Sequence, residues 1–104
     1  MPLFRVTYAE GNTAPTARGE MFQGVSPQYE TFEAETRVAA YIAAYQHFTA
    51  KGYDVTVLGR GEGEGRPLGF SPDEIEAISH AGIPLTIGLP KQGVQIQEIL
   101  RQVE

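Results

Sequence analysis

Cysteine is absent from this chain, and serine and histidine are scarce. Without cysteine there is no disulfide, no thiol nucleophile and no thiolate metal site. None of the three serines (Ser26, Ser71 and Ser79) sits in a GxSxG nucleophile elbow. The two histidines, His47 and His80, form no metal-binding spacing, so structural roles are favoured for both. The sequence therefore predicts no metal, no cofactor and no catalytic residue.

Long apolar runs and basic runs are missing as well. The longest apolar stretch, residues 38–45, falls well short of the ~20 residues that a membrane span needs. The first residues lack the basic lead and apolar core of a signal peptide. The eight Lys and Arg are scattered, and thirteen acidic residues bring the net charge to −5. We expect a cytoplasmic protein that binds no membrane and does not bind nucleic acid directly.

What the chain does contain is enough apolar sequence for a core. It has 104 residues, of which 41% are hydrophobic and 20% are charged. These proportions are typical of a globular protein, and disorder would require fewer apolar residues and a larger net charge. A chain of this length forms one domain and can bury a core without metal or disulfide staples. We therefore expect residues 1–104 to form a single domain.

Apolar periodicity predicts the secondary structure. Alternation indicates strands at 3–8, 16–25 and 53–58, with a turn at 10–15 and a short strand at 85–89 between two prolines. A long helix is expected from Ser26 or Thr31 to Lys51, because its apolar residues recur at i, i+3, i+4 and i+7 and acidic residues crowd its first turns. The spacing of Ile96, Ile99 and Val103 predicts a last helix after Gly93.

The order of these elements favours an α+β fold. An antiparallel hairpin is followed by helix, strand, helix, strand and helix (ββαβαβα), with the helices mainly on one face of a four-stranded sheet. If residues 16–25 form a loop instead, the same string becomes a three-stranded parallel α/β sheet (βαβαβα). The alternation within residues 17–22 favours the first arrangement.

The helix at 72–81 has the strongest boundary signals. Ser71 is the expected N-cap, and Glu74 stands where it completes a capping box. At the other end Gly82 occupies the C′ position. Ile83 and Ile78 have the spacing of the hydrophobic contact in a Schellman motif.

The stretch GRGEGEGRPLG, residues 59–69, carries glycine at alternate positions. It lacks the lysine and hydroxyl of a P-loop and the register of a dinucleotide-binding fingerprint. Glu62 and Glu64 would repel a phosphate, although Arg60 and Arg66 could bind an anion. We predict a flexible loop or an extended arm that places these four charged residues on one face, where they form a candidate binding surface.

Tyrosine is abundant, with five residues beside five phenylalanines. Tyr41 and Tyr45 lie one helical turn apart, so their rings share a face. The structural interpretation is a core or rim stripe. The functional interpretation is a protein contact surface, where tyrosine is enriched.

Three functional hypotheses follow. The leading one is a small, non-catalytic module that binds another protein or itself, as a homo-oligomer. The first alternative is a small-ligand-binding protein or enzyme with a site near His47 or His80 and Arg60 or Arg66. The second is an acidic decoy that occupies the basic site of a nucleic-acid-binding protein.

Overall fold

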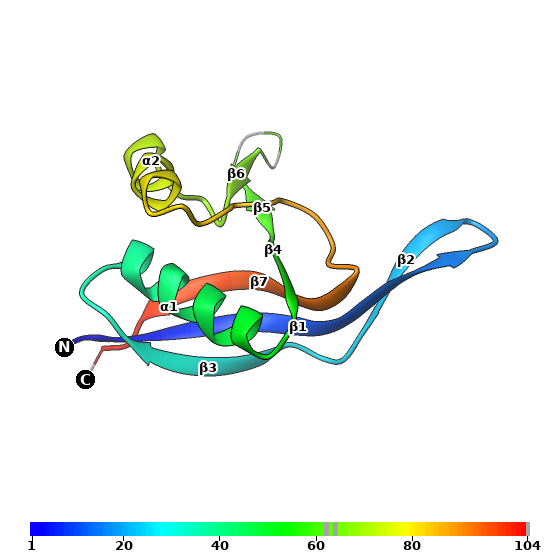
Figure 1. Ribbon diagram of the computed structural model, residues 1–104, viewed down its shortest axis with the longest axis horizontal. Coiled ribbons are helices and arrows are strands. Elements are labelled where there is room, and N and C mark those ends of the chain that lie inside the picture. The colour runs from blue at the N-terminus through cyan, green and yellow to red at the C-terminus, as the bar shows by residue number, and fades with distance from the viewer. Residues whose placement is uncertain (62, 64, 104) are drawn as a thin grey trace.

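A computed structural model describes residues 1–61, 63 and 65–103 of this protein (Figure 1). The fold is built around one long strand, β1 (Leu3–Thr16). The fold is a mixed α+β arrangement with two helices. In chain order the elements are β1 (Leu3–Thr16), β2 (Gly19–Gly24), β3 (Gln28–Glu33), α1 (Arg37–Ala50), β4 (Asp54–Val57), β5 (Gly59–Arg60), β6 (Arg66–Pro67), α2 (Pro72–His80) and β7 (Gln92–Arg101).

Strand β1 pairs with three other strands of a five-stranded sheet. Along one of its edges β3 pairs with the first half of β1 and β2 pairs with the second half, both antiparallel. Along the other edge β7 is antiparallel to β1, and β4 runs parallel to β7. The far end of β1 and β2 project from the body as a two-stranded ribbon, which lengthens the molecule to 46 Å against 25 and 24 Å in the other directions (Figure 1).

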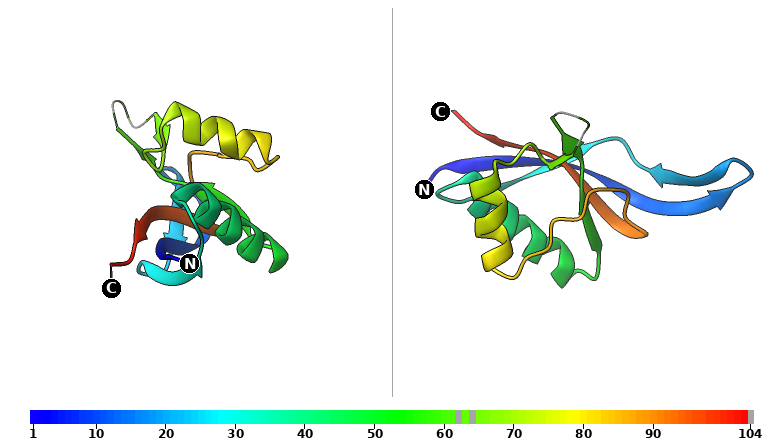
Figure 2. Two further views of the ribbon diagram at one scale, coloured as in Figure 1. Left: turned by 90° about the vertical axis from the view of Figure 1, so that its left-hand side faces the viewer. Right: turned by 90° about the horizontal axis from the view of Figure 1, so that it is seen from above.

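Both helices lie on the same face of the sheet, and the core lies between them and the strands (Figure 2). Alternate residues of β1 face this core while their neighbours face the opposite side. The bulkiest fully buried side chains are Tyr41, Phe48, Phe70, Ile78, Ile96, Val6, Val57 and Val94. Neither helix in the described part of the chain is long and apolar enough to cross a membrane.

Both predicted ends of α2 are confirmed. The Ser71 hydroxyl accepts a hydrogen bond from the Glu74 backbone N–H at 3.3 Å, and the Glu74 carboxylate accepts one from the Ser71 N–H at 3.0 Å. At the C-terminal end the Ile83 N–H donates to the Ile78 carbonyl at 3.2 Å. Gly82 has a φ of 76°, a left-handed conformation that glycine adopts at little cost.

The prediction of a third helix was wrong, because residues 92–101 form β7. The core-facing residues of this strand are Val94, Ile96 and Ile99. A β-bulge shifts its register against β1 between Thr7 and Tyr8, so one apolar step is three residues long. The three-residue spacing of Ile96 and Ile99 is the i, i+3 spacing of a helix, which explains the wrong prediction.

The long helix begins later than predicted. Its N-cap is Thr36, whose side chain accepts a hydrogen bond from the Ala39 N–H. Residues 28–33, which a helix start at Ser26 would place in its first turns, form β3 instead. Strands β3 and β7 join the sheet and residues 85–89 do not, so the sheet has five strands. The acidic residues that suited a helix N-terminus lie before α1, which has none in its first turn.

Two smaller predictions also need correction. The expected turn at 10–15 lies inside β1, and the chain reverses only at 17–18. Gly11 is required there by close packing, because a Cβ would lie 2.2 Å from the Gln23 carbonyl oxygen. The expected strand at 85–89 is reduced to a single bridge between Ile87 and Val57. The expected strand at 16–25 is present as β2, which rules out the parallel alternative.

Candidate functional site

The outer edge of β3 is the first candidate site. In the described residues β3 pairs with β1 alone, and no element lies along its outer side (Figure 1). The Ala34 N–H donates to the Pro2 carbonyl at 3.0 Å, which makes these opposite residues a hydrogen-bonded pair. Because such pairs alternate along an antiparallel ladder, the backbone N–H and C=O groups of Tyr29, Thr31 and Glu33 point away from β1. They form an unpaired row at the edge of the sheet.

The sheet face opposite the helices adjoins this edge. It carries exposed apolar side chains, including Leu3, Leu100 and Tyr29 at 40%, 43% and 66% exposure. The Arg5 guanidinium lies over the Tyr29 ring, 5.3 Å from its centroid. The Arg5 Nε atom is buried and has no hydrogen-bond partner within the described residues. This face and the β3 edge together form a surface with apolar side chains and available backbone groups.

On the helix side, β3 contacts the end of α1 through a histidine. His47 Nε2 lies 2.9 Å from a Glu30 carboxylate oxygen, an ion-pair distance without the alignment of a hydrogen bond. The His47 ring packs edge-on against Phe32 and Phe48. Nearby, burial raises the pKa of the Tyr8 hydroxyl, and the Glu30 carboxylate raises it further. These contacts anchor β3 to α1 and leave its outer edge open.

The second candidate site is a pocket of about 240 Å³ beside the start of α1. It is lined by Arg37, Arg60, Leu68, Gly69, Glu98, Ile99 and Leu100. Arg60 lies 3.7 Å from Glu98, and within the short β5–β6 ladder it stands directly opposite Arg66. The pairing therefore places a second positive charge next to Arg60, which lines the pocket.

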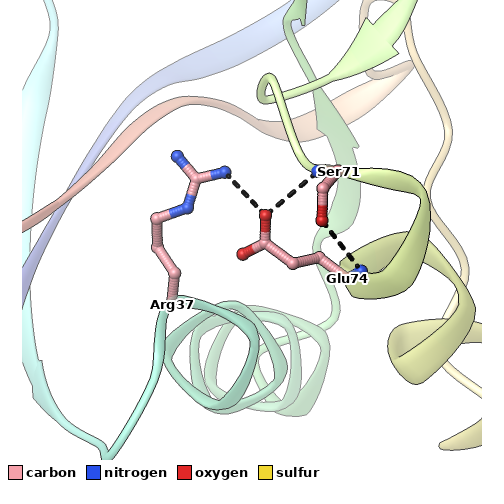
Figure 3. Close-up of polar contacts among 3 residues, drawn as sticks. All are labelled: Arg37, Ser71 and Glu74. Atoms are coloured by element: carbon pink, nitrogen blue, oxygen red, sulfur yellow. Dashed lines mark hydrogen bonds and ion pairs between the residues drawn. The ribbon is translucent and has the colours of Figure 1, made fainter.

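Arg37 enters this pocket as the first residue of α1. Its guanidinium lies over the Phe70 ring, 4.5 Å from the centroid, and 3.7 Å from the Glu74 carboxylate. The same carboxylate oxygen accepts the N–H of Ser71, so the capping box of α2 also holds the Arg37 head group (Figure 3). The pocket therefore combines guanidinium groups from two separate elements.

The charged residues predicted as a binding surface are only partly brought together. Arg60 and Arg66 are opposite residues of the antiparallel β5–β6 ladder, so residues 59–67 do not form one extended strand. Glu62 and Glu64 lie outside the described residues. The histidines lie elsewhere: His47 is ten residues beyond Arg37 on α1, roughly 15 Å along its axis. His80 is exposed at the end of α2, 3.6 Å from Glu76.

The predicted tyrosine pair is mostly internal. Tyr41 is fully buried, and its hydroxyl donates a hydrogen bond to the Pro84 carbonyl at 2.8 Å. Burial raises the pKa of this hydroxyl well above its usual value, and Tyr45 adds to the shift. The ring of Tyr45 lies 6.3 Å from that of Tyr41 and is only partly buried. Tyr41 belongs to the core, so only Tyr45 reaches the surface.

Sequence reasoning missed the β3 edge and Arg37. Strand β3 was assigned to a helix, which hid its free backbone groups. The only sequence signal that places Arg37 at the start of α1 is the preceding Thr36, which is the N-cap of this helix. Among the described residues, no group of three or more metal-ligating side chains is arranged to hold a metal ion.

Comparisons of the chain with protein-family models, curated proteins and solved structures find no match. The function must therefore be inferred from the geometry alone.

Proposed function

We propose that this chain is a small, non-catalytic protein-binding module that pairs an extended segment of its partner with the free edge of β3. The observation that carries the proposal is the row of outward backbone groups at Tyr29, Thr31 and Glu33. An exposed sheet edge is a template for strand addition, in which main-chain hydrogen bonds supply affinity and side-chain contacts supply specificity.

The surroundings of β3 support this mode of binding. The ladder with β1 and the contacts of His47 hold the strand in an extended conformation before a partner arrives, so little ordering is needed on binding. The exposed rings and aliphatic groups on the adjacent face would contact alternate side chains of an added strand. Tyr29 is the most prominent of them, and tyrosine is enriched in protein interfaces.

A backbone substitution at the edge tests the proposal. Thr31→Pro removes an outward N–H without removing a hydrogen bond to β1, and proline is tolerated on edge strands. Thr31→Val is the matched control, because it keeps the N–H. In affinity capture from the cell that makes the protein, we expect partners to bind the parent and Thr31→Val and to be lost with Thr31→Pro.

Two outcomes would count against edge pairing. One is a folded Thr31→Pro variant that retains every partner, and the other is a parent chain that captures nothing and does not self-associate. Circular dichroism establishes whether the variant is folded. If Thr31→Pro does not fold, Glu33→Pro makes the equivalent change at the end of the strand.

The pocket beside α1 supports a second candidate function, the binding of a small molecule that carries a carboxylate or phosphate group. Guanidinium groups form paired hydrogen bonds with both oxyanions. Arg37 and Arg60 both line the pocket. Among the described residues each guanidinium is ion-paired with a carboxylate at 3.7 Å, which is beyond hydrogen-bond distance, so an oxyanion could compete for its donors.

The charge balance of the pocket gives this candidate a two-sided test. Glu98→Gln removes a negative charge from the lining and should strengthen oxyanion binding, whereas Arg60→Gln should weaken it. NMR titrations with inorganic phosphate and with malonate would compare the two ligand chemistries. Identical affinities for both variants, or no saturable shift in the parent, would dismiss this function.

A further inference from the structure

We infer that the strand that pairs with β3 belongs to a second copy of this chain, with Thr31 of both copies on a two-fold axis. The inference rests on the proposed function and names its partner. Two identical edge strands pair antiparallel around a two-fold axis, and each register places a different residue on that axis. The register can therefore be derived from the positions of the outward groups and of the charges.

Only one symmetric register uses every outward residue. With Thr31 on the axis, Thr31 faces its own copy and Tyr29 faces Glu33 of the second copy, so all three outward residues enter hydrogen-bonded pairs. An axis at Glu30 or at Phe32 leaves one outward residue of each copy without a partner. An axis at Tyr29 or Glu33 retains a single hydrogen-bonded pair.

Charge is compatible with the same register and disfavours two of the others. An axis at Glu30 or Glu33 would place a carboxylate directly opposite its own copy, and such pairs are destabilising. With Thr31 on the axis, Glu30 faces Phe32 of the second copy and Glu33 faces Tyr29. No acidic residue of β3 then opposes another, and a threonine pair at the centre is favourable. A chain with a net charge of −5 can thus pair with itself here without a direct carboxylate clash.

The remaining geometry is compatible with this pairing. The axis of an antiparallel edge pair stands perpendicular to the sheet, so the helices of both copies would lie on the same face. The two sheets would join into one, and the open faces that carry Leu3 and Leu100 would become continuous. A six-residue strand pair is smaller than a standard stable interface, so the dimer is expected to be weak and concentration-dependent.

The absence of cysteine makes the register directly measurable. In a Thr31→Cys variant the only thiols of a dimer would lie on the axis, with Cα atoms about 5.5 Å apart, a separation that a disulfide spans. Tyr29→Cys is the matched control, because its thiols would be roughly 14 Å apart. We expect mild oxidation to link Thr31→Cys to itself and to leave Tyr29→Cys alone unlinked. A mixture of Tyr29→Cys and Glu33→Cys should link as a heterodimer.

Sedimentation equilibrium of the parent up to millimolar concentration separates the possible failures. A reversible dimer with the expected cross-links supports the inference. A dimer whose Thr31→Cys variant does not link, or links no better than Tyr29→Cys, overturns the register. A strictly monomeric chain overturns the second copy as partner, and the proposed function then stands or falls on the affinity capture of a different protein.

Discussion

Replacing the buried Tyr41 with phenylalanine should change how the stability of the protein depends on pH. In the folded protein the Tyr41 hydroxyl is buried and donates a hydrogen bond to the Pro84 carbonyl. Burial raises the pKa of this hydroxyl above the ordinary tyrosine value of about 10. The folded state therefore keeps this proton at a pH where the unfolded chain releases it.

The sign and size of the effect follow from this difference. Below about pH 10 both states hold the proton, and the full contribution of Tyr41 to stability is present. As the pH rises toward the folded-state pKa, the unfolded chain binds fewer protons, so the free energy of unfolding falls by about 1.4 kcal/mol per pH unit. Tyr41→Phe loses one hydrogen bond, worth about 1 kcal/mol at neutral pH, but it also loses this slope. The two stability curves should cross near pH 11, at the point where these two effects cancel.

Urea unfolding followed by circular dichroism from pH 7 to pH 11 measures both curves. Tyr29→Phe is the control for loss of a hydroxyl at an exposed position. A Tyr41→Phe variant that loses stability above pH 10 as steeply as the parent would refute the reasoning. If Tyr41 instead belonged to a contact surface, the variant would keep the stability of the parent and bind its partner less tightly.

Three further substitutions test the local structure. Ser71→Ala removes the cap of α2 and should cost about 1 kcal/mol in urea unfolding, whereas Ser79→Ala, at an exposed site of the same helix, should cost much less. Gly11→Ala should lower the free energy of unfolding by about 1–3 kcal/mol, because its Cβ would meet the Gln23 carbonyl. Arg60→Gln should change stability by less than about 1 kcal/mol in the same assay, because the ion pair of Arg60 is half exposed.

The elements that the sequence predicted correctly are those whose signals are local. Helix α2 was predicted with both ends because Ser71, Glu74 and Gly82 act within one turn of their own positions. Strand β4 was predicted because Val55 and Val57 alternate with polar residues and face the core. In both cases the residues that indicate the element lie within it or directly next to its ends.

The elements that were missed depend on residues far away in the chain. The bulge in β7 is defined only against β1, some ninety residues earlier, and by itself its apolar spacing favours a helix. In the sequence Gly11 is typical of a turn, and its actual role depends on the close approach of the Gln23 backbone in the paired strand. The pocket joins Arg37 and Arg60, which no sequence spacing connects. Contacts between residues so far apart in the chain produce no pattern within a sequence segment of about ten or fifteen residues.

The candidate site at β3 was hidden for a different reason. Its functional groups are the backbone N–H and C=O of Tyr29, Thr31 and Glu33, and every non-proline residue carries such groups. What makes these three distinctive is that β1 occupies the other edge of the strand and nothing described occupies theirs. The polar and acidic side chains of β3 fit this position, because charge on an exposed edge limits indiscriminate pairing. The same charges oppose symmetric pairing centred on Glu30 or Glu33, and the proposed register centred on Thr31 avoids both oppositions.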